Sequence, residues 1–229
     1  MIAAERQGIQ FIDKMPPYPG DHEATEAERW IKDRITDPLT AKRWLLPWEP
    51  RDDYIRIFGF PIITSEAIRW LTEHPDLAGT TFIGIGSGTG YLEHEIRKAG
   101  GNAIATDPHP WQETFGKKTD LPVTRATHKQ SLRILSETPN SVMILSWPEN
   151  HVLWPQETVE EYDGAHLLFI GEGESDNLRS TGTKEMFKTL ERNFIITDTF
   201  NLPNFTGITD DVRLYTRRTM PINGAQICS

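Results

Sequence analysis

One segment restricts the fold of this chain more than any other: a short apolar run that leads through closely spaced glycines directly into a helical pattern. The run is Thr81–Ile85, the glycines are Gly86, Gly88 and Gly90, and the helical pattern starts at Tyr91. Glycine tolerates positive φ and has no Cβ, so a ligand can lie against the backbone. The opening turn of a helix offers unpaired N–H groups that suit an anion such as a carboxylate. The segment therefore predicts a strand–turn–helix unit with a ligand at its turn.

The chain beyond residue 80 alternates short apolar runs with amphipathic helical patterns, which is typical of βαβ units and a mostly parallel sheet. We expect strands at Thr81–Ile85, Ala103–Thr106, Pro122–Ala126, Val142–Ser146 and His166–Ile170, and helices at about Tyr91–Ala99, Lys129–Glu137, Gln156–Tyr162 and Thr183–Arg192. In the first helix, Glu93 and Arg97 are expected to form an exposed i,i+4 pair. Two final β-rich runs, Phe194–Phe200 and Val212–Arg217, are joined without a helical pattern, so we expect them to be antiparallel neighbours.

Residues 21–78 indicate a mainly helical region, in which Thr64 or Ser65 can cap a helix that ends at His74. We expect two parts, an N-terminal helical lid or extension at 1–78 and a ligand-binding core at 79–229. The N-terminal aromatic side chains can either close over a cleft or share one core with the sheet, and the set is Trp30, Trp44, Trp48, Tyr54 and Phe58.

The glycine spacing distinguishes between two kinds of nucleotide site. A dinucleotide fingerprint, G-x-G-x-x-G, fails here, because its sixth position is Thr89 when counted from Gly84 and Tyr91 when counted from Gly86. The G-x-G-x-G register is the one expected of proteins that bind S-adenosylmethionine (SAM). Asp107 ends the next apparent strand, 17 residues after Gly90, where a carboxylate can accept hydrogen bonds from both ribose hydroxyls.

With the loop Gly86–Tyr91 and the later pair Trp147-Pro148, the sequence resembles the class I SAM-dependent methyltransferases. Within that class it is similar to a little-characterised group whose loop reads G-x-G-T-G-Y and whose later strand ends in an aromatic-Pro pair. The resemblance covers roughly residues 60–218. It implies an α/β, Rossmann-like sheet of seven strands, mostly parallel, with an antiparallel last strand, and SAM as the cofactor. The cofactor-binding residues that we expect are Glu66, Gly86, Ser87, Gly88, Thr89, Gly90, Asp107, Pro108 and Ser146.

The chain departs from these enzymes at one position. They usually carry Asp or Glu two residues before the first glycine of the loop, near the methionine ammonium, and this chain has Gly84 there. Either another acid substitutes, for which Glu66 on the preceding helix is our candidate, or cofactor binding is weakened.

In open α/β sheets ligands bind beyond the carboxyl ends of the strands, and these ends supply candidates for the acceptor site. Trp147 and Pro148 are expected to contact the substrate. Pro148 makes the turn rigid, and the indole ring of Trp147 beside it can stack on a flat acceptor or hold a methylammonium group by a cation–π contact. An amine acceptor needs only to arrive unprotonated, whereas an alcohol needs a base. The candidate bases are Glu172, Glu149 and His109, followed by His128 and His151.

The charge of the chain limits its partners. The net charge is −9, and nine acidic residues but no Lys or Arg lie between Ile134 and Leu178. This block is either a solvated face or a region that steers cationic ligands, and it disfavours a nucleic-acid partner. The single cysteine, Cys228, argues against a disulfide or zinc framework, and no apolar run is long enough to span a bilayer, so we expect a cytoplasmic protein without a metal.

The function expected from these features is methyl transfer to a nitrogen or oxygen atom of a small-molecule acceptor. Three alternatives stay open: a methyltransferase for protein or nucleic acid, a catalytically inactive binding protein with the same fold, and another nucleotide-dependent α/β enzyme. The oligomeric state is not predicted by any of these patterns.

Overall fold

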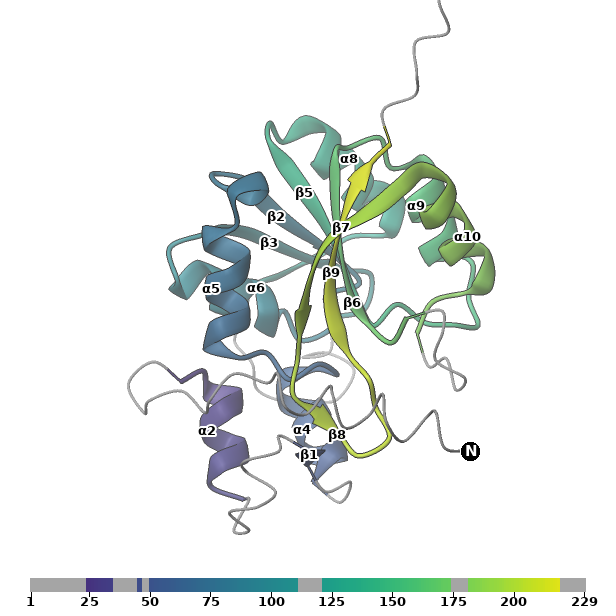
Figure 1. Cartoon of the computed structure of the whole chain (residues 1–229). Coiled ribbons are helices and arrows are strands. Elements are labelled where there is room, and N and C mark those ends of the chain that lie inside the picture. The colour runs from purple at the N-terminus through teal and green to yellow at the C-terminus, as the bar shows by residue number, and fades with distance from the viewer. Residues whose placement is uncertain (1–23, 35–44, 47–49, 111–120, 174–180, 219–229) are drawn as a thin grey trace, which may run out of the picture.

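The computed structural model has a central seven-stranded sheet with helices on both faces (Figure 1). The structure describes residues 24–34, 45–46, 50–110, 121–173 and 181–218. The strands of the sheet are β2 (Thr81–Ile85), β3 (Asn102–Asp107), β4 (Val123–Arg125), β5 (Ser141–Ser146), β6 (His166–Gly171), β7 (Phe194–Asn201) and β9 (Asp211–Arg217). Two short strands form a separate parallel pair, β1 (Leu45–Leu46) and β8 (Asn204–Phe205).

The strand order is β4-β3-β2-β5-β6-β9-β7. The pairs among β2 to β6 are parallel, whereas β9 is antiparallel to both of its neighbours, β6 and β7. The sheet therefore contains one reversed strand, the last in the sequence, placed between β6 and β7. This confirms the expected Rossmann-like architecture and the expected antiparallel pairing of the two final strands.

The helices lie in two groups on the sheet. One face carries α5 (Ser65–Glu73) and α6 (Tyr91–Lys98), and the other carries α8 (His128–Glu137), α9 (Trp154–Glu161) and α10 (Lys184–Asn193) (Figure 1). Further helices at the N-terminal end of the described chain are α2 (Glu26–Lys32), α4 (Arg51–Phe58) and the 3-10 turn η1 (Pro75–Leu77). Among the described residues, no helix combines the length and the apolar character that crossing a membrane would require.

Alternation along the strands explains the two layers of core. In β5, Val142 and Ile144 belong to the hydrophobic cluster under α5 and α6, whereas Met143 and Leu145 belong to the cluster under α8, α9 and α10. Successive side chains of a strand point to opposite faces, so a run of apolar residues is buried on both sides. The near-continuous apolar strands seen in the sequence follow from this arrangement.

The N-terminal helices share the first of these clusters. Ala27, Ile31, Tyr54 and Phe58 are buried in the same hydrophobic group as Phe82 of the sheet. The Tyr91 hydroxyl of α6 also accepts a hydrogen bond from the backbone N–H of Ala27 at 3.0 Å. For the N-terminal aromatic residues the sequence left two possibilities, a lid over a cleft or one core shared with the sheet, and Tyr54 and Phe58 belong to a shared core. The division of the chain at residues 78 and 79 stays a prediction, and the aromatic residues Trp44 and Trp48 lie outside the described residues.

Local side-chain caps set several helix starts. The Thr64 hydroxyl accepts from the backbone N–H of Ala67 at the start of α5, so Thr64 rather than Ser65 is the cap. Thr127 and Gln130 form a reciprocal capping box at the start of α8. At α10 the cap is Thr183, whose hydroxyl accepts from the N–H of Met186. Such caps satisfy orphan N–H groups of the first turn, and this is why the helices begin close to the predicted positions.

Candidate functional site

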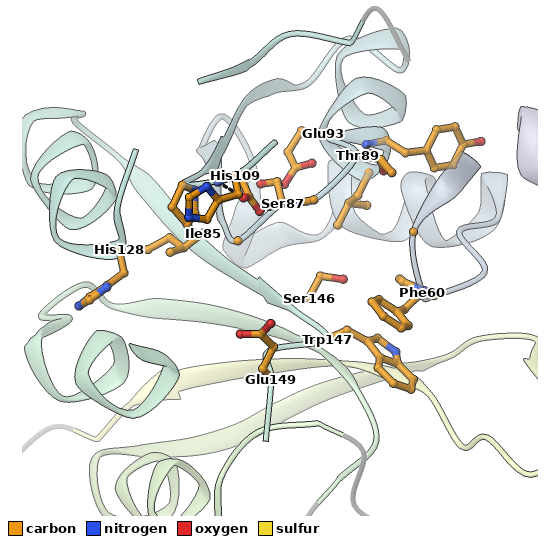
Figure 2. A pocket seen from close by; sticks show the side chains of 18 of the residues that line it. Phe60, Ile85, Ser87, Thr89, Glu93, His109, His128, Ser146, Trp147 and Glu149 are labelled. Atoms are coloured by element: carbon orange, nitrogen blue, oxygen red, sulfur yellow. Dashed lines mark hydrogen bonds between the residues drawn. The ribbon is translucent and has the colours of Figure 1, made fainter. Parts of the chain in front are cut away.

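The connections of the sheet create a crevice at the carboxyl end of β2. The chain passes from β2 to β3 on one side and later returns to β5 on the other, so β2 lies where the strand order reverses. Ligands of open α/β sheets bind at such points. A cavity of about 720 Å³ opens here, and Figure 2 shows its lining side chains. Its walls come from the loop after β2, the ends of β3 and β5, the start of α9 and the segment after α4.

The glycine loop lies against this cavity in a conformation that few other residues adopt. Gly86 has φ +73° and Gly90 has φ +72°, both in the left-handed region. A Cβ at Gly86 would approach the Trp154 ring to 2.9 Å, so the absence of a side chain also makes room for this tryptophan. The turn is therefore specific for glycine for two reasons, the backbone angle and the packing.

Asp107 lies at the end of β3, directly beside the loop. One carboxylate oxygen, Oδ2, accepts from the Gly88 N–H at 2.9 Å, and the other, Oδ1, accepts from the His109 N–H at 2.7 Å. Burial raises the pKa of Asp107, and the two backbone hydrogen bonds oppose this rise. The loop and the carboxylate predicted from the sequence thus meet at one cavity, which Asp107 also lines.

Glu93 corrects one expectation of the sequence analysis. It was expected to be exposed in an i,i+4 pair with Arg97, but its side chain is 2% exposed and lines the cavity. Its Oε1 accepts from the Ser87 hydroxyl at 2.8 Å, and burial raises its pKa to about 7 (Figure 2). Arg97 instead donates to the Ala103 carbonyl at 2.9 Å. The sequence reasoning missed Glu93 as a site residue. Its place in the first turn after the loop was the available signal.

Most of the residues predicted to bind the cofactor line this cavity: Gly86, Ser87, Gly88, Thr89, Asp107, Pro108 and Ser146. Two of them are not among the described lining residues. Gly90 caps the N-terminus of α6 in the left-handed conformation, and Glu66 is the second residue of α5, where it accepts from the Ser65 hydroxyl at 3.3 Å.

The predicted substrate residue Trp147 is held in an uncommon conformation at the end of β5. Its φ is +49°, which is an outlier for a bulky side chain. Its ring stacks on Phe60 with centroids 4.7 Å apart and planes 9° apart, and its Nε1 donates to the buried Asp210 at 2.8 Å. One ring face is therefore occupied by Phe60, and the two rings together form an aromatic wall (Figure 2). Pro148 is buried and is not among the described lining residues.

The candidate bases separate into two groups. Glu149, His109, His128 and His151 line the cavity. Glu149 accepts from the Trp154 Nε1 at 3.1 Å, and His128 pairs with Glu157 at 3.0 Å. Glu172, our first candidate, is 2% exposed, is not among the described lining residues, and lies close enough to Asp210 and Arg51 to influence their charge.

The acidic block of the sequence does not form one uniform solvated face. Within it, Glu149 lines the cavity, Glu172 is buried, and Glu157 pairs with a histidine. Glu137 forms an exposed ion pair with Arg133 at 2.7 Å. Two further acids of the block, Glu174 and Asp176, lie outside the described residues.

Comparisons with known proteins gave matches only among solved structures. No family model and no curated protein matches this chain. Three structures similar to this chain are a protein from Streptococcus pneumoniae provisionally assigned as a tRNA (m1A22) methyltransferase, the pyocyanin biosynthetic protein PhzM, and the magnesium protoporphyrin IX methyltransferase ChlM from Synechocystis PCC 6803 with bound SAM.

The sequence identities to these three are 16%, 15% and 16%, and the TM-scores are 0.43, 0.40 and 0.43. The matches cover 63%, 66% and 67% of this chain and 66%, 54% and 77% of theirs, so this chain spans less than two thirds of the length of the first two. We therefore infer the function from this chain's own cavity. With its seven strands in this order and β9 reversed between β6 and β7, the chain has a Rossmann-like α/β fold.

Proposed function

We propose that this protein is a SAM-dependent methyltransferase that transfers the methyl group of SAM to a nitrogen or oxygen atom of a small-molecule acceptor. The observation that carries this proposal is the hydrogen bond from the Gly88 N–H to Asp107 Oδ2, 2.9 Å long, at the wall of one cavity. It joins the backbone that can hold the amino-acid end of an adenosyl ligand to the carboxylate that can hold its ribose.

The residues around the cavity fit such a cofactor. Each carboxylate oxygen of Asp107 has two lone pairs, so after accepting one backbone N–H apiece both oxygens can still accept ribose hydroxyls. Gly86 has no side chain of its own and lies beside the Trp154 ring at the cavity wall, and the volume of about 720 Å³ is within the range of about 300–1,000 Å³ common for small-molecule sites. Pro108 and His109 continue the wall next to the ribose position.

SAM, when bound, supplies a methyl group on a positively charged sulfur. Held by the Gly86–Gly90 loop and Asp107, SAM would give this methyl to the acceptor's nitrogen or oxygen, the electron pair of the broken bond would stay on the sulfur of S-adenosylhomocysteine (SAH), and the acceptor would lose a proton. The main task of this chain's residues is alignment of the acceptor, which can supply up to about 7–11 kcal/mol of the barrier. For a hydroxyl acceptor, Glu149 or His109 is the proposed base, because both line the cavity.

The charge and shape of the cavity favour a small, flat or cationic acceptor. Its described lining includes the acids Glu93, Asp107 and Glu149 and contains neither Lys nor Arg. Nucleic-acid binding depends on cations placed against phosphates, so this lining suits an amine better than a phosphate backbone. The Phe60–Trp147 wall adds an aromatic surface, and the segment from Phe58 to Ile63 covers this side of the cavity as part of the proposed N-terminal lid.

Isothermal titration calorimetry with SAM and SAH tests the proposal. We expect both to bind the wild type, and Asp107→Ala to weaken both by about tenfold or more, because hydrogen bonds to a charged group are lost. Asp163→Ala, which changes an exposed aspartate at the end of α9, is the control and is expected to bind like the wild type. The proposal is wrong if the wild type binds neither ligand, and the ribose assignment is wrong if Asp107→Ala binds normally.

A second measurement addresses the acceptor. SAH release from SAM is followed with panels of small amines and phenols, and an RNA and a DNA duplex are tested by gel shift at about 0.15 M salt, where weak electrostatic binding is screened. We expect turnover within the small-molecule panel and no stable nucleic-acid complex. Tight, competitor-resistant binding of either duplex would favour a nucleic-acid acceptor instead.

A further inference from the structure

The carboxyl group of Glu93 fills the space that a side chain at position 84 would need. A Cβ built on Gly84 would lie 1.8 Å from Glu93 Oε1 and 2.3 Å from the Ser87 hydroxyl oxygen. Gly84 lies within β2 and is not among the residues with positive φ, so its backbone does not require glycine. The reason for glycine is therefore steric: the carboxyl group of Glu93, which comes from α6, lies where a side chain at position 84 would start.

The carboxyl group of Glu93 is only partly paired. Oε1 accepts from the Ser87 hydroxyl, while Oε2 is buried without a hydrogen-bond partner, on a side chain that is 2% exposed. An unpaired buried acceptor destabilises the folded state, and a charged one does so more strongly. Because Glu93 lines the cavity, a donor supplied by a ligand would remove this cost.

The surroundings favour an organic cation over a metal ion as that donor. In the described part of the chain no three His, Cys, Asp or Glu side chains come together as a metal site, and hard divalent ions need several oxygen ligands. Burial raises the pKa of Glu93 to about 7, the Ser87 hydrogen bond and Arg97 oppose the rise, and Asp107 adds to it. A cation beside Oε2 would reverse this shift and hold the carboxylate ionised.

We infer that Glu93, placed in the space left by Gly84, is the residue that binds the α-ammonium group of the cofactor's amino-acid part. This inference rests on the proposed function. Glu93 takes the role that the sequence analysis assigned to Glu66, because Glu93 lines the cavity and Glu66 is not among its described lining residues. Ser87 acts as a positioning residue: its hydroxyl donates to Glu93 and accepts from the Thr106 N–H at 3.2 Å, and this ties the carboxylate to β3.

The test compares two ligands that differ in the ammonium group. SAH carries the amino-acid part, whereas 5′-methylthioadenosine has the adenosine and the thioether without it. We expect Glu93→Gln, which removes the charge and keeps the size, to weaken SAH by about tenfold or more and to leave methylthioadenosine within about twofold. The methylthioadenosine titration also verifies that the variant keeps a folded site.

Three further variants sharpen the test. Glu95→Gln alters a neighbouring acid of α6 that pairs with Lys98 at 2.9 Å and is outside the described cavity lining, so it should bind both ligands like the wild type. The exchange Gly84→Asp with Glu93→Ala moves the carboxylate from the helix to the strand and should recover most of the SAH affinity lost in Glu93→Gln. Gly84→Asp alone should lose stability, because it crowds Glu93.

The possible outcomes separate the inference from the proposed function. Equal weakening of both ligands by Glu93→Gln would mean that Glu93 only supports the loop, and no weakening of SAH would remove it from the site. Either result overturns the inference and leaves the proposed function standing. If the wild type binds neither SAH nor methylthioadenosine, both fail.

Discussion

Asp210 is a buried acid whose chemistry is strongly altered by its surroundings. It is 3% exposed, its Oδ2 accepts from the Trp147 Nε1, and its Oδ1 is buried without a hydrogen-bond partner. Burial raises its pKa to about 8, and the nearby Glu172 and Asp211 add to the rise while the Trp147 hydrogen bond and Arg51 oppose it. The carboxyl group therefore keeps its proton to a higher pH in the folded chain than in the unfolded chain.

This raised pKa predicts a pH dependence of stability. The contribution of Asp210 is fully present below about pH 4, where the unfolded chain also keeps the proton, and it is lost as pH rises towards 8. Asp210→Asn cannot ionise, so its free energy of unfolding should gain on that of the wild type by up to about 1.4 kcal/mol per pH unit in this range. Urea unfolding at pH 5, 6, 7 and 8 measures the difference, with Asp163→Asn as the exposed control. A difference that does not change with pH would contradict the raised pKa of Asp210.

At the scale of the element, the turn between β2 and α6 combines two constraints that can be separated. Gly86 and Gly79 have similar backbone angles, φ +73° and +68°, but a Cβ at Gly79 would meet nothing within 4 Å, whereas a Cβ at Gly86 would meet Trp154 at 2.9 Å. Gly79→Ala therefore measures the backbone cost alone, and Gly86→Ala adds the crowding.

We expect both alanine variants to lose about 1–2 kcal/mol of unfolding free energy for the left-handed conformation. Gly86→Ala should lose more than this and should also weaken SAH by about tenfold or more, because Trp154 must move at the cavity wall. Gly79→Ala should bind SAH normally. Chemical unfolding and calorimetric titration of the two variants give the comparison, and equal stability with equal affinity would show that the Trp154 contact is unimportant.

At the scale of the whole molecule, the N-terminal helices and the sheet share one hydrophobic cluster. Tyr54 and Phe58 contact each other with tilted rings and make edge contacts with Trp30, Tyr91 and Phe205, with ring centroids 5.0 to 6.2 Å apart. Removal of the N-terminal helices would expose this face of the sheet to water, at a cost of roughly 25 cal/mol per Å² of apolar area.

Shared burial predicts one cooperative unfolding transition. Differential scanning calorimetry of the full chain should show a single peak, and SAH at about 100 times its Kd should stabilise the folded state by about 2.7 kcal/mol and shift that peak as a whole. The fragment 79–229 is expected to aggregate or to lack a cooperative transition. Two separate peaks, or a fragment that unfolds cooperatively, would instead support an independent N-terminal lid.

The predictions made from local patterns were confirmed where one element decides the outcome by itself. The strands β2, β3, β5 and β6 follow from apolar runs buried on both faces, and the start of α5 follows from the cap at Thr64. The meeting of the glycine loop with Asp107 could also be predicted, because parallel strands end at the same edge of a sheet.

What the amino-acid sequence by itself determined is the order of the elements and the edge of the sheet where polar side chains gather, because periodicity, caps and glycines act over a few residues. The tertiary structure alone decided which acids face the cavity. Glu93 is buried because Gly84, on a different element, leaves it room, whereas Glu172 is buried outside the described lining of the cavity. Burial and the pKa shifts it causes depend on neighbours that only the folded chain brings together, and no local pattern records them.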